Sequence, residues 1–90
     1  MTVTVHLIAQ LKNAAGSPSL RVEVPDGATL KDVAAKAAER GGENLKAILL
    51  DDKGQPRAGV LAFAGDDQAG WNDALKPATD VTLMSGISGG

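Results

Sequence analysis

The chain has 90 residues and a formal net charge of −2, which predicts a single globular domain and, with no run of Lys or Arg, no nucleic acid partner. No apolar stretch approaches the roughly 18 residues of a membrane-spanning helix, and the N-terminus lacks a signal-peptide pattern, so we expect no membrane segment. Cysteine is absent, which excludes disulfides, thiolate catalysis and cysteine-based metal sites and makes a cytoplasmic location the expectation.

The first elements are predicted to be two strands. Residues 2–8 read Thr-Val-Thr-Val-His-Leu-Ile, the alternation of a half-buried strand. Residues 13–19 contain Gly, Ser and Pro and are expected to form a loop. Alternation resumes over residues 20–24. Two strands this close in the sequence predict an antiparallel hairpin.

A helix is predicted next, over residues 29–40. Its apolar positions recur at the helical spacing and form one stripe: Leu30, Val33, Ala34, Ala37 and Ala38. Thr29 and Asp32 have the spacing of a capping box. Gly41-Gly42 provides the C-terminal stop.

The second half of the chain is expected to contain mainly strands. Residues 45–50 form an apolar run that fits a strand or a short helical turn. Residues 60–64 predict a strand with Leu61 and Phe63 on one face. Residues 67–78 are expected to be a long connection, and residues 80–85 alternate as a final strand.

This order of elements predicts an α+β fold with a mixed four- to five-stranded sheet packed on one main helix. We expect the strands at 2–8 and 80–85 to be central and parallel to each other. One sheet face would cover the helix. The other would be open and would carry these side chains: Thr4, His6, Ile8, Thr82 and Met84.

The C-terminal residues differ from the rest. We expect a folded domain over residues 1–84 and a flexible tail over residues 85–90, which reads Ser-Gly-Ile-Ser-Gly-Gly. Glycine has no side chain to anchor the tail on a core. Fully extended, the six residues reach at most about 20 Å, enough to enter a narrow slot in another protein.

The chain resembles the ThiS/MoaD family of ubiquitin-like sulfur carriers over essentially its whole length. The most specific segment is Leu-Lys-Pro-Ala-Thr-Asp-Val-Thr-Leu-Met at residues 75–84, followed by the terminal Gly-Gly. Residues 60–64 also resemble a strand of the family. The resemblance implies a β-grasp (ubiquitin-like) fold.

The resemblance also implies a function that depends on the α-carboxylate of Gly90. A ubiquitin-activating-like enzyme would use ATP and Mg²⁺ to adenylate this carboxylate, and a sulfur donor would replace AMP to leave a thiocarboxylate. A sulfur-accepting synthase would then receive the sulfur in cofactor or metabolite biosynthesis. On this interpretation the chain is a co-substrate and not an enzyme, binds no cofactor of its own, and is monomeric when free.

Two further groups of residues are candidates for contact with a partner. Ile87, Ser88 and Gly89 would enter the partner's active site behind Gly90. Ile8 and Met84 are candidates for a partner surface on the open face.

Other residues have simpler interpretations. His6 is interpreted as an exposed strand histidine, and the Asp66-Asp67 pair as a solvated turn, so no metal site is expected. Trp71 is interpreted as a lid on the edge of the core, with an interface anchor as the alternative.

Three alternative functions remain open. The chain could be a protein modifier that is joined to lysines through Gly90. It could be the small subunit of molybdopterin synthase, or a β-grasp binding module with an inert tail.

Overall fold

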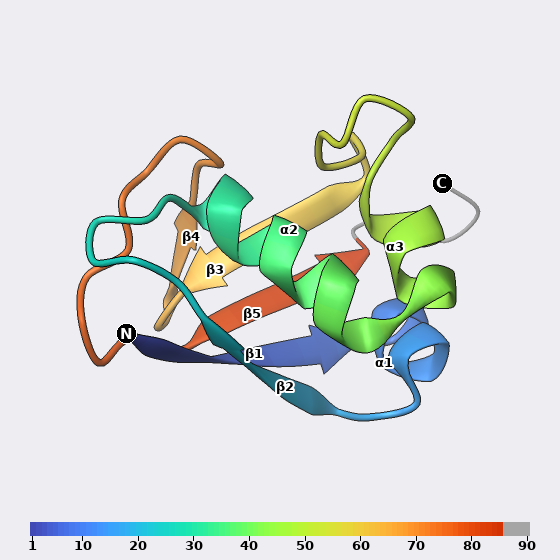
Figure 1. Ribbon diagram of the computed structural model, residues 1–90, viewed down its shortest axis with the longest axis horizontal. Coiled ribbons are helices and arrows are strands. Elements are labelled where there is room, and N and C mark those ends of the chain that lie inside the picture. Colours follow the sequence, from blue (N-terminus) through green and yellow to red (C-terminus); the bar gives the residue numbers. More distant parts are fainter. Residues whose placement is uncertain (86–90) are drawn as a thin grey trace.

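The computed structural model describes residues 1–85, which form a five-stranded mixed sheet and three helices (Figure 1). The strands are β1 (Thr2–Ile8), β2 (Ser19–Glu23), β3 (Val60–Ala64), β4 (Asp67–Ala69) and β5 (Val81–Ser85). The helices are α1 (Gln10–Ala15), α2 (Leu30–Gly41) and α3 (Glu43–Leu49). In this part of the chain no helix has both the length and the apolar character needed to cross a membrane.

The sheet has the strand order β2-β1-β5-β3-β4. β1 pairs with β2 in antiparallel fashion and with β5 in parallel fashion, while β3 is antiparallel to both β5 and β4. The predicted hairpin and the predicted parallel pairing of the first and last strands are therefore confirmed. β5 has a neighbour on each side, so the strand that precedes the tail lies at the centre of the sheet.

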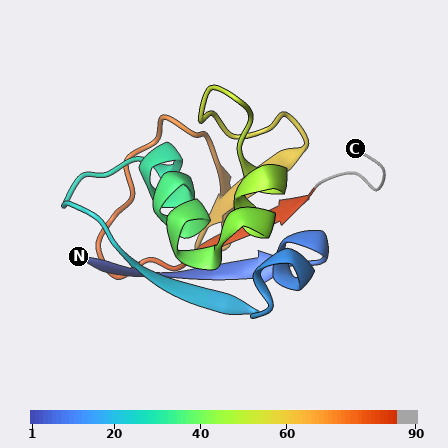
Figure 2. The ribbon, with the colours of Figure 1, turned by 45° about the vertical axis from the view of Figure 1, so that its right-hand side comes forward.

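α2 is the main helix and lies across one face of the sheet (Figure 1). The turned view in Figure 2 shows α2 and α3 on the same side of the sheet. The predicted capping box is present, because Asp32 N donates to Thr29 Oγ1 at 3.3 Å and Thr29 N donates to Asp32 Oδ2 at 3.0 Å. The helix includes Gly41, one residue beyond the predicted end, and Gly42 of the predicted Gly41-Gly42 stop is its C-cap.

The core lies between α2 and the sheet and consists of Val, Leu and Ala side chains. All five apolar positions of the predicted stripe on α2 are buried. Val3, Val5 and Leu7 of β1 and Val81 and Leu83 of β5 are buried beneath them. The core contains no buried polar or charged side chain among residues 1–85.

Two predictions from the sequence were wrong about local structure. Residues 13–19 are not all loop, because α1 extends over Gln10–Ala15 and only then does the chain turn, with Gly16 in the left-handed conformation. The predicted connection over residues 67–78 begins with a short strand, β4. The sheet therefore has five strands, and α1 and α3 accompany the one predicted helix.

The ambiguous run at residues 45–50 is mostly helical. α3 covers Glu43–Leu49, and Leu45 and Leu49, four residues apart, are both fully buried. Leu50 then leaves the helix in an extended conformation and forms an isolated bridge with Pro56. The helical alternative is correct for all but the last residue of the run.

Candidate functional site

The predicted reactive end, Gly90, lies outside the described residues, as do Ile87, Ser88 and Gly89. The structure does describe the strand that precedes them. Through Ser85 this strand is paired with β3, in register with Val60, and on its other side it is paired with β1. Met84 is therefore held by a strand on each side, and Ser85, the last described residue, is held by β3.

The open face of the sheet presents the side chains that alternate with the buried ones. In β1, buried Val3, Val5 and Leu7 alternate with exposed or half-buried neighbours. Ile8 is 42 % exposed and is the one large hydrophobic residue classed as exposed in residues 1–85. Met84 lies directly opposite Ile8 in the parallel β1–β5 register. The predicted outward placement of both residues is confirmed.

Two more large apolar side chains share this face. Leu61 on β3 lies opposite Met84 on β5, and Phe63 lies opposite Thr82. Both are half-buried, whereas Val60 and Ala62, on the other face of β3, are buried. Ile8, Met84 and Leu61 thus form a row across three neighbouring strands, with Phe63 beside it. We call these four residues the open-face patch.

The patch extends what was predicted from the sequence. Ile8 and Met84 were identified there, but Leu61 and Phe63 were only assigned to a common face of their strand. The two largest side chains of residues 60–64 both occupy odd positions, so the sequence places them on one face, but it does not show that this face is the open one.

His6 lies next to the patch and has an acidic partner. Its Nε2 is 2.9 Å from Asp80 Oδ2, and the two side chains are 43 % and 60 % exposed. His6 is also in register with Thr82, which lies opposite Phe63. His6 was expected to be an exposed strand histidine, and it is partly exposed on its strand. Its carboxylate partner is the residue just before β5, 74 residues away in the sequence.

No group of three or more His, Asp or Glu side chains within residues 1–85 is arranged to hold a metal ion. Asp66 lies in the turn between β3 and β4, Asp67 is the first residue of β4, and both are exposed. The structure thus gives these two carboxylates the solvated environment that was expected of them.

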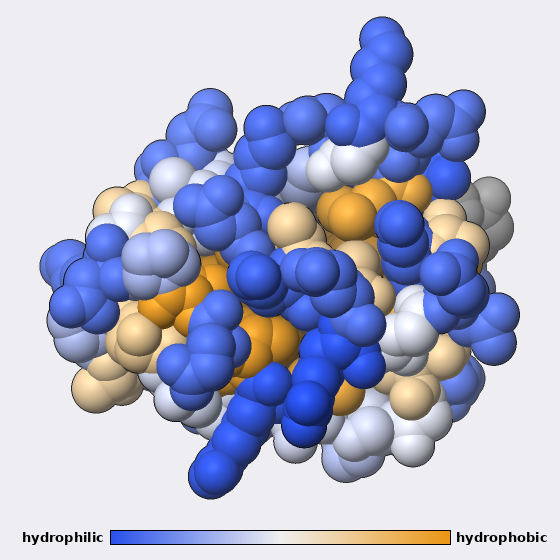
Figure 3. Space-filling model, in the orientation of Figure 1, coloured by the Kyte–Doolittle hydropathy of each residue, from blue (hydrophilic) through white to orange (hydrophobic). Residues whose placement is uncertain are grey.

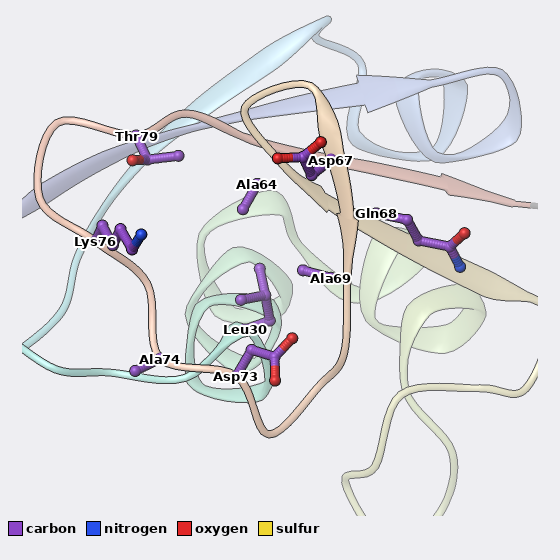
Figure 4. A pocket seen from close by; sticks show the side chains of 9 residues that line it. All are labelled: Leu30, Ala64, Asp67, Gln68, Ala69, Asp73, Ala74, Lys76 and Thr79. Carbon is purple, nitrogen blue, oxygen red and sulfur yellow. The ribbon is translucent and has the colours of Figure 1, made fainter.

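A pocket of about 360 Å³ lies beside β4, at the end of the sheet where β5 begins (Figure 4). Leu30 and small side chains of Ala64, Ala69 and Ala74 line it, with Asp73 and Lys76 at its side. The carboxylate of Asp73 accepts a hydrogen bond from Gly70 N at 2.8 Å, so it closes the turn over residues 70–73. This pocket borders the N-terminal end of β5, whereas the tail leaves from the C-terminal end.

Trp71, in the same connection, is half-buried and packs against the core. Its carbonyl oxygen accepts a hydrogen bond from Lys31 N, in the first turn of α2, at 2.9 Å. Trp71 therefore covers the edge of the core, as the preferred interpretation predicted.

No model of a known protein family matches this chain, and no curated protein matches it in sequence. Solved structures do. Small archaeal modifier protein 1 from Haloferax volcanii is 23 % identical, covers 100 % of both chains and has a TM-score of 0.87.

Two further structures match over nearly their whole length. A proposed molybdopterin converting factor, subunit 1, from Pyrococcus furiosus is 21 % identical, covers 97 % of this chain and 99 % of that chain, and has a TM-score of 0.75. A chain of the BexX/CysO complex from Amycolatopsis orientalis is 20 % identical, covers 98 % and 99 %, and has a TM-score of 0.69. These likenesses agree with the resemblance found in the sequence. They show that the chain has the β-grasp fold of ubiquitin-like proteins.

Proposed function

We propose that this chain is a sulfur carrier whose C-terminal carboxylate, on Gly90, is adenylated by a partner enzyme and then converted to a thiocarboxylate. The single observation that supports this most is the position of β5. β5 has a paired strand on each side and ends at Ser85. Five more residues follow in the sequence, and the last two are Gly89 and Gly90. A folded domain followed by a short segment whose last two residues have no side chain suits delivery of a carboxylate into another protein's active site.

The chemistry explains why a partner and ATP are needed. A carboxylate is a poor electrophile, and its adenylate carries AMP as a good leaving group. A sulfur donor on the partner displaces AMP, and the resulting thiocarboxylate passes its sulfur to an acceptor on a synthase. The carrier supplies only the carboxylate, so it acts as a co-substrate, and ATP and Mg²⁺ belong to the activating enzyme.

The open-face patch is the surface we assign to the activating enzyme. Its side chains are Ile8, Leu61, Phe63 and Met84. Met84 directly precedes Ser85, at which β5 ends. An enzyme that covers the patch would hold the domain next to the exit of the tail. Burial of apolar side chains that are already half-exposed favours such docking without any change of fold.

The test is activation of the tail in a purified system. The full chain, its cognate adenylating enzyme, ATP and Mg²⁺ are assayed by ATP–pyrophosphate exchange. With a sulfur donor added, intact mass spectrometry should show the replacement of one oxygen by sulfur. The mass of the untreated protein isolated from its own cells must first correspond to a chain that ends at Gly90.

Two variants make the test specific for the tail. One extra residue after Gly90 moves the carboxylate by about 3.5 Å, and a misplacement of about 1 Å already costs on the order of a hundredfold in rate. Gly89→Val restricts and widens the tail. Both variants should lose exchange while keeping the melting temperature of the wild type. Exchange at the wild-type rate by either variant would refute the assignment of Gly90.

A second candidate function is protein modification through Gly90. It is favoured by the likeness to small archaeal modifier protein 1, whose name describes a modifier. Both functions begin with the same adenylate, but a modifier ends in an isopeptide bond to a lysine. Higher-mass species that contain the chain and survive reduction would support this function, and a thiocarboxylate without them would support the carrier. A third, the small subunit of molybdopterin synthase, is suggested by the Pyrococcus furiosus structure and requires a larger subunit that binds the tail.

A further inference from the structure

β2 is one edge of the sheet, because β1 is its only neighbour in the strand order. In both Figure 1 and Figure 2 no other described segment lies on the outer side of β2. An edge strand presents unpaired backbone N–H and C=O groups, which can pair with a strand of another chain. The identity of the outward groups follows from the hydrogen bonds to β1.

The flanking hydrogen bonds fix which residues of β2 bond to β1. Val24 N donates to Met1 O at 3.0 Å, and the amino group of Met1 donates to Val24 O at 2.7 Å. At the other end, Leu7 N donates to Pro18 O at 2.9 Å. In an antiparallel ladder every second residue bonds to its neighbour. The even-numbered residues between positions 18 and 24 therefore bond to β1, and the odd-numbered ones face outward.

The outward residues are Ser19, Arg21 and Glu23. Ser19 already uses its backbone groups, because Ser17 Oγ donates to Ser19 O at 2.8 Å and accepts from Ser19 N at 3.4 Å. The N–H and C=O groups of Arg21 and Glu23 have no hydrogen-bond partner within residues 1–85. The free edge of β2 thus consists of two donors and two acceptors.

The side chains at this edge carry opposite charges. Arg21 and Glu23 are both exposed and lie on the open face, opposite Thr4 and Thr2 of β1. The hydroxyl of Thr2 donates to the carboxylate of Glu23, which holds that carboxylate on this face. Along this edge the positive Arg21 and the negative Glu23 therefore stand on either side of the buried Val22.

We propose that the chain binds a second copy of itself by antiparallel pairing of the two β2 edges, centred on Val22. In this register Arg21 of each copy lies opposite Glu23 of the other, and the four free groups of each copy find partners in four backbone hydrogen bonds. Shifting the pairing by two residues would place Arg21 opposite Arg21 or Glu23 opposite Glu23. Like charges directly opposite each other are unfavourable, so charge selects the register centred on Val22.

A copy of this chain fits the edge better than a peptide of uniform charge. The shallow groove beside β2 is lined by Arg21, Val22 and Glu23 and by Lys36, Glu39 and Arg40 of α2. Figure 3 shows hydrophobic residues between hydrophilic side chains in the region between α2 and β2. A uniformly acidic segment would meet the two glutamates, and a basic one the three cations. In an isologous contact each copy offers the same mixture of positive and negative side chains to the other, so each charge can face one of opposite sign.

This inference is independent of the proposed function and goes beyond it. None of the four patch residues lies on β2, and the free edge of β2 is the one that faces away from β1, β5 and β3. Pairing at β2 therefore leaves the patch and the exit of the tail free in both copies. The contact involves one five-residue strand per copy, so it is weak. The expected free monomer is then in a concentration-dependent equilibrium with a dimer.

The experiment is sedimentation equilibrium of the full chain at low salt, up to about 1 mM, a range suited to small transient contacts. The wild type should approach twice its 9.1 kDa mass, and added salt should weaken the association. Arg21→Glu and Glu23→Arg should each weaken it at least tenfold, because each change places like charges opposite each other at two positions.

The two variants should recover association when they are mixed. In the mixed pair every position 21 again meets the opposite charge at position 23, so an equimolar mixture should form a heterodimer. The matched control is Lys53→Glu, which has the same net charge as Arg21→Glu but lies on an exposed loop away from β2. Three results would overturn the proposal: a wild type that stays monomeric, single variants that associate like the wild type, or a mixture that does not recover.

Discussion

Leu83 and Met84 are neighbours in β5 that point to opposite faces of the sheet, so replacing each should have a different consequence. Leu83 is fully buried and lies between Leu7 of β1 and Ala62 of β3. A Leu→Ala change at such a position costs about 2–5 kcal/mol in the free energy of unfolding. For a domain of this size each kcal/mol lowers the melting temperature by roughly 4–8 °C. A loss of about 3 kcal/mol therefore corresponds to roughly 12–24 °C.

Met84→Asp should lower the free energy of unfolding much less than Leu83→Ala does. Met84 is half-buried on the open face, so a carboxylate at this position stays in contact with water and only part of one side chain's apolar contact is lost. We expect a cost of about 1 kcal/mol or less, as for most surface substitutions. Binding to the adenylating enzyme should show the reverse order, because a charge in the desolvated centre of an interface is costly unless it is paired.

The assays are thermal and denaturant unfolding followed by circular dichroism, together with a binding titration at a temperature where both variants are folded. Leu83→Ala should be unstable but bind normally, and Met84→Asp should be stable but bind weakly. Equal destabilisation by the two variants would refute the assignment of an open face. Normal binding by a stable Met84→Asp, and by a matching Ile8→Asp, would leave the open face intact and refute only its role as the docking surface.

Three further outcomes are expected. Thr29→Ala removes the capping box and should lower the free energy of unfolding, measured by denaturant titration, by about 1 kcal/mol. Gly41→Ala should destabilise by about 1–3 kcal/mol despite the better helix propensity of alanine, because its Cβ would clash with the buried Leu45 side chain; an increase in melting temperature would contradict this. The pKa of Asp51 lies below the ordinary value of 3.8, chiefly because Gln55 N donates to its carboxylate, so an NMR titration should give a midpoint below 3.8. The contribution of this carboxylate to stability is present above its unfolded-state pKa and is lost as the pH falls through the lowered one.

The elements that were predicted correctly carry a periodic signal, and in the main helix a second feature supports it. In α2 the apolar stripe coincides with the capping box at Thr29 and with the terminal glycines. α1 has a weaker signal, because Leu11 is its only buried residue. It still has apolar residues at helical spacing and Gly16 as a left-handed cap, which could have identified it. β4 has no such signal: its Asp-Gln-Ala sequence becomes a strand only through pairing with β3.

The residues of the candidate site also divide into those that the sequence predicts and those that it does not. Ile8 and Met84 could be placed on the open face because their strands alternate clearly between apolar and polar residues. Residues 60–64 are apolar on both faces, so the sequence places Leu61 and Phe63 on one face of the strand but does not show which face the helix covers. The contact between His6 and Asp80 could not be predicted, because it depends on the register of the β1–β5 pair, which the parallel pairing alone does not fix. The predicted roles of Ile87, Ser88, Gly89 and Gly90 remain predictions.

The parallel pairing of β1 with β5 also determines when the protein can fold. The centre of the sheet joins Ile8 to Met84, so its formation must close a loop that spans most of the chain, and such non-local contacts form slowly. During synthesis β1, β2 and α2 leave the ribosome long before residues 81–85, and until then the free edge of β1 has no partner. A nascent chain is thus exposed to aggregation through that edge, and only a chain that has closed the loop holds β5, and with it the start of the tail, in place.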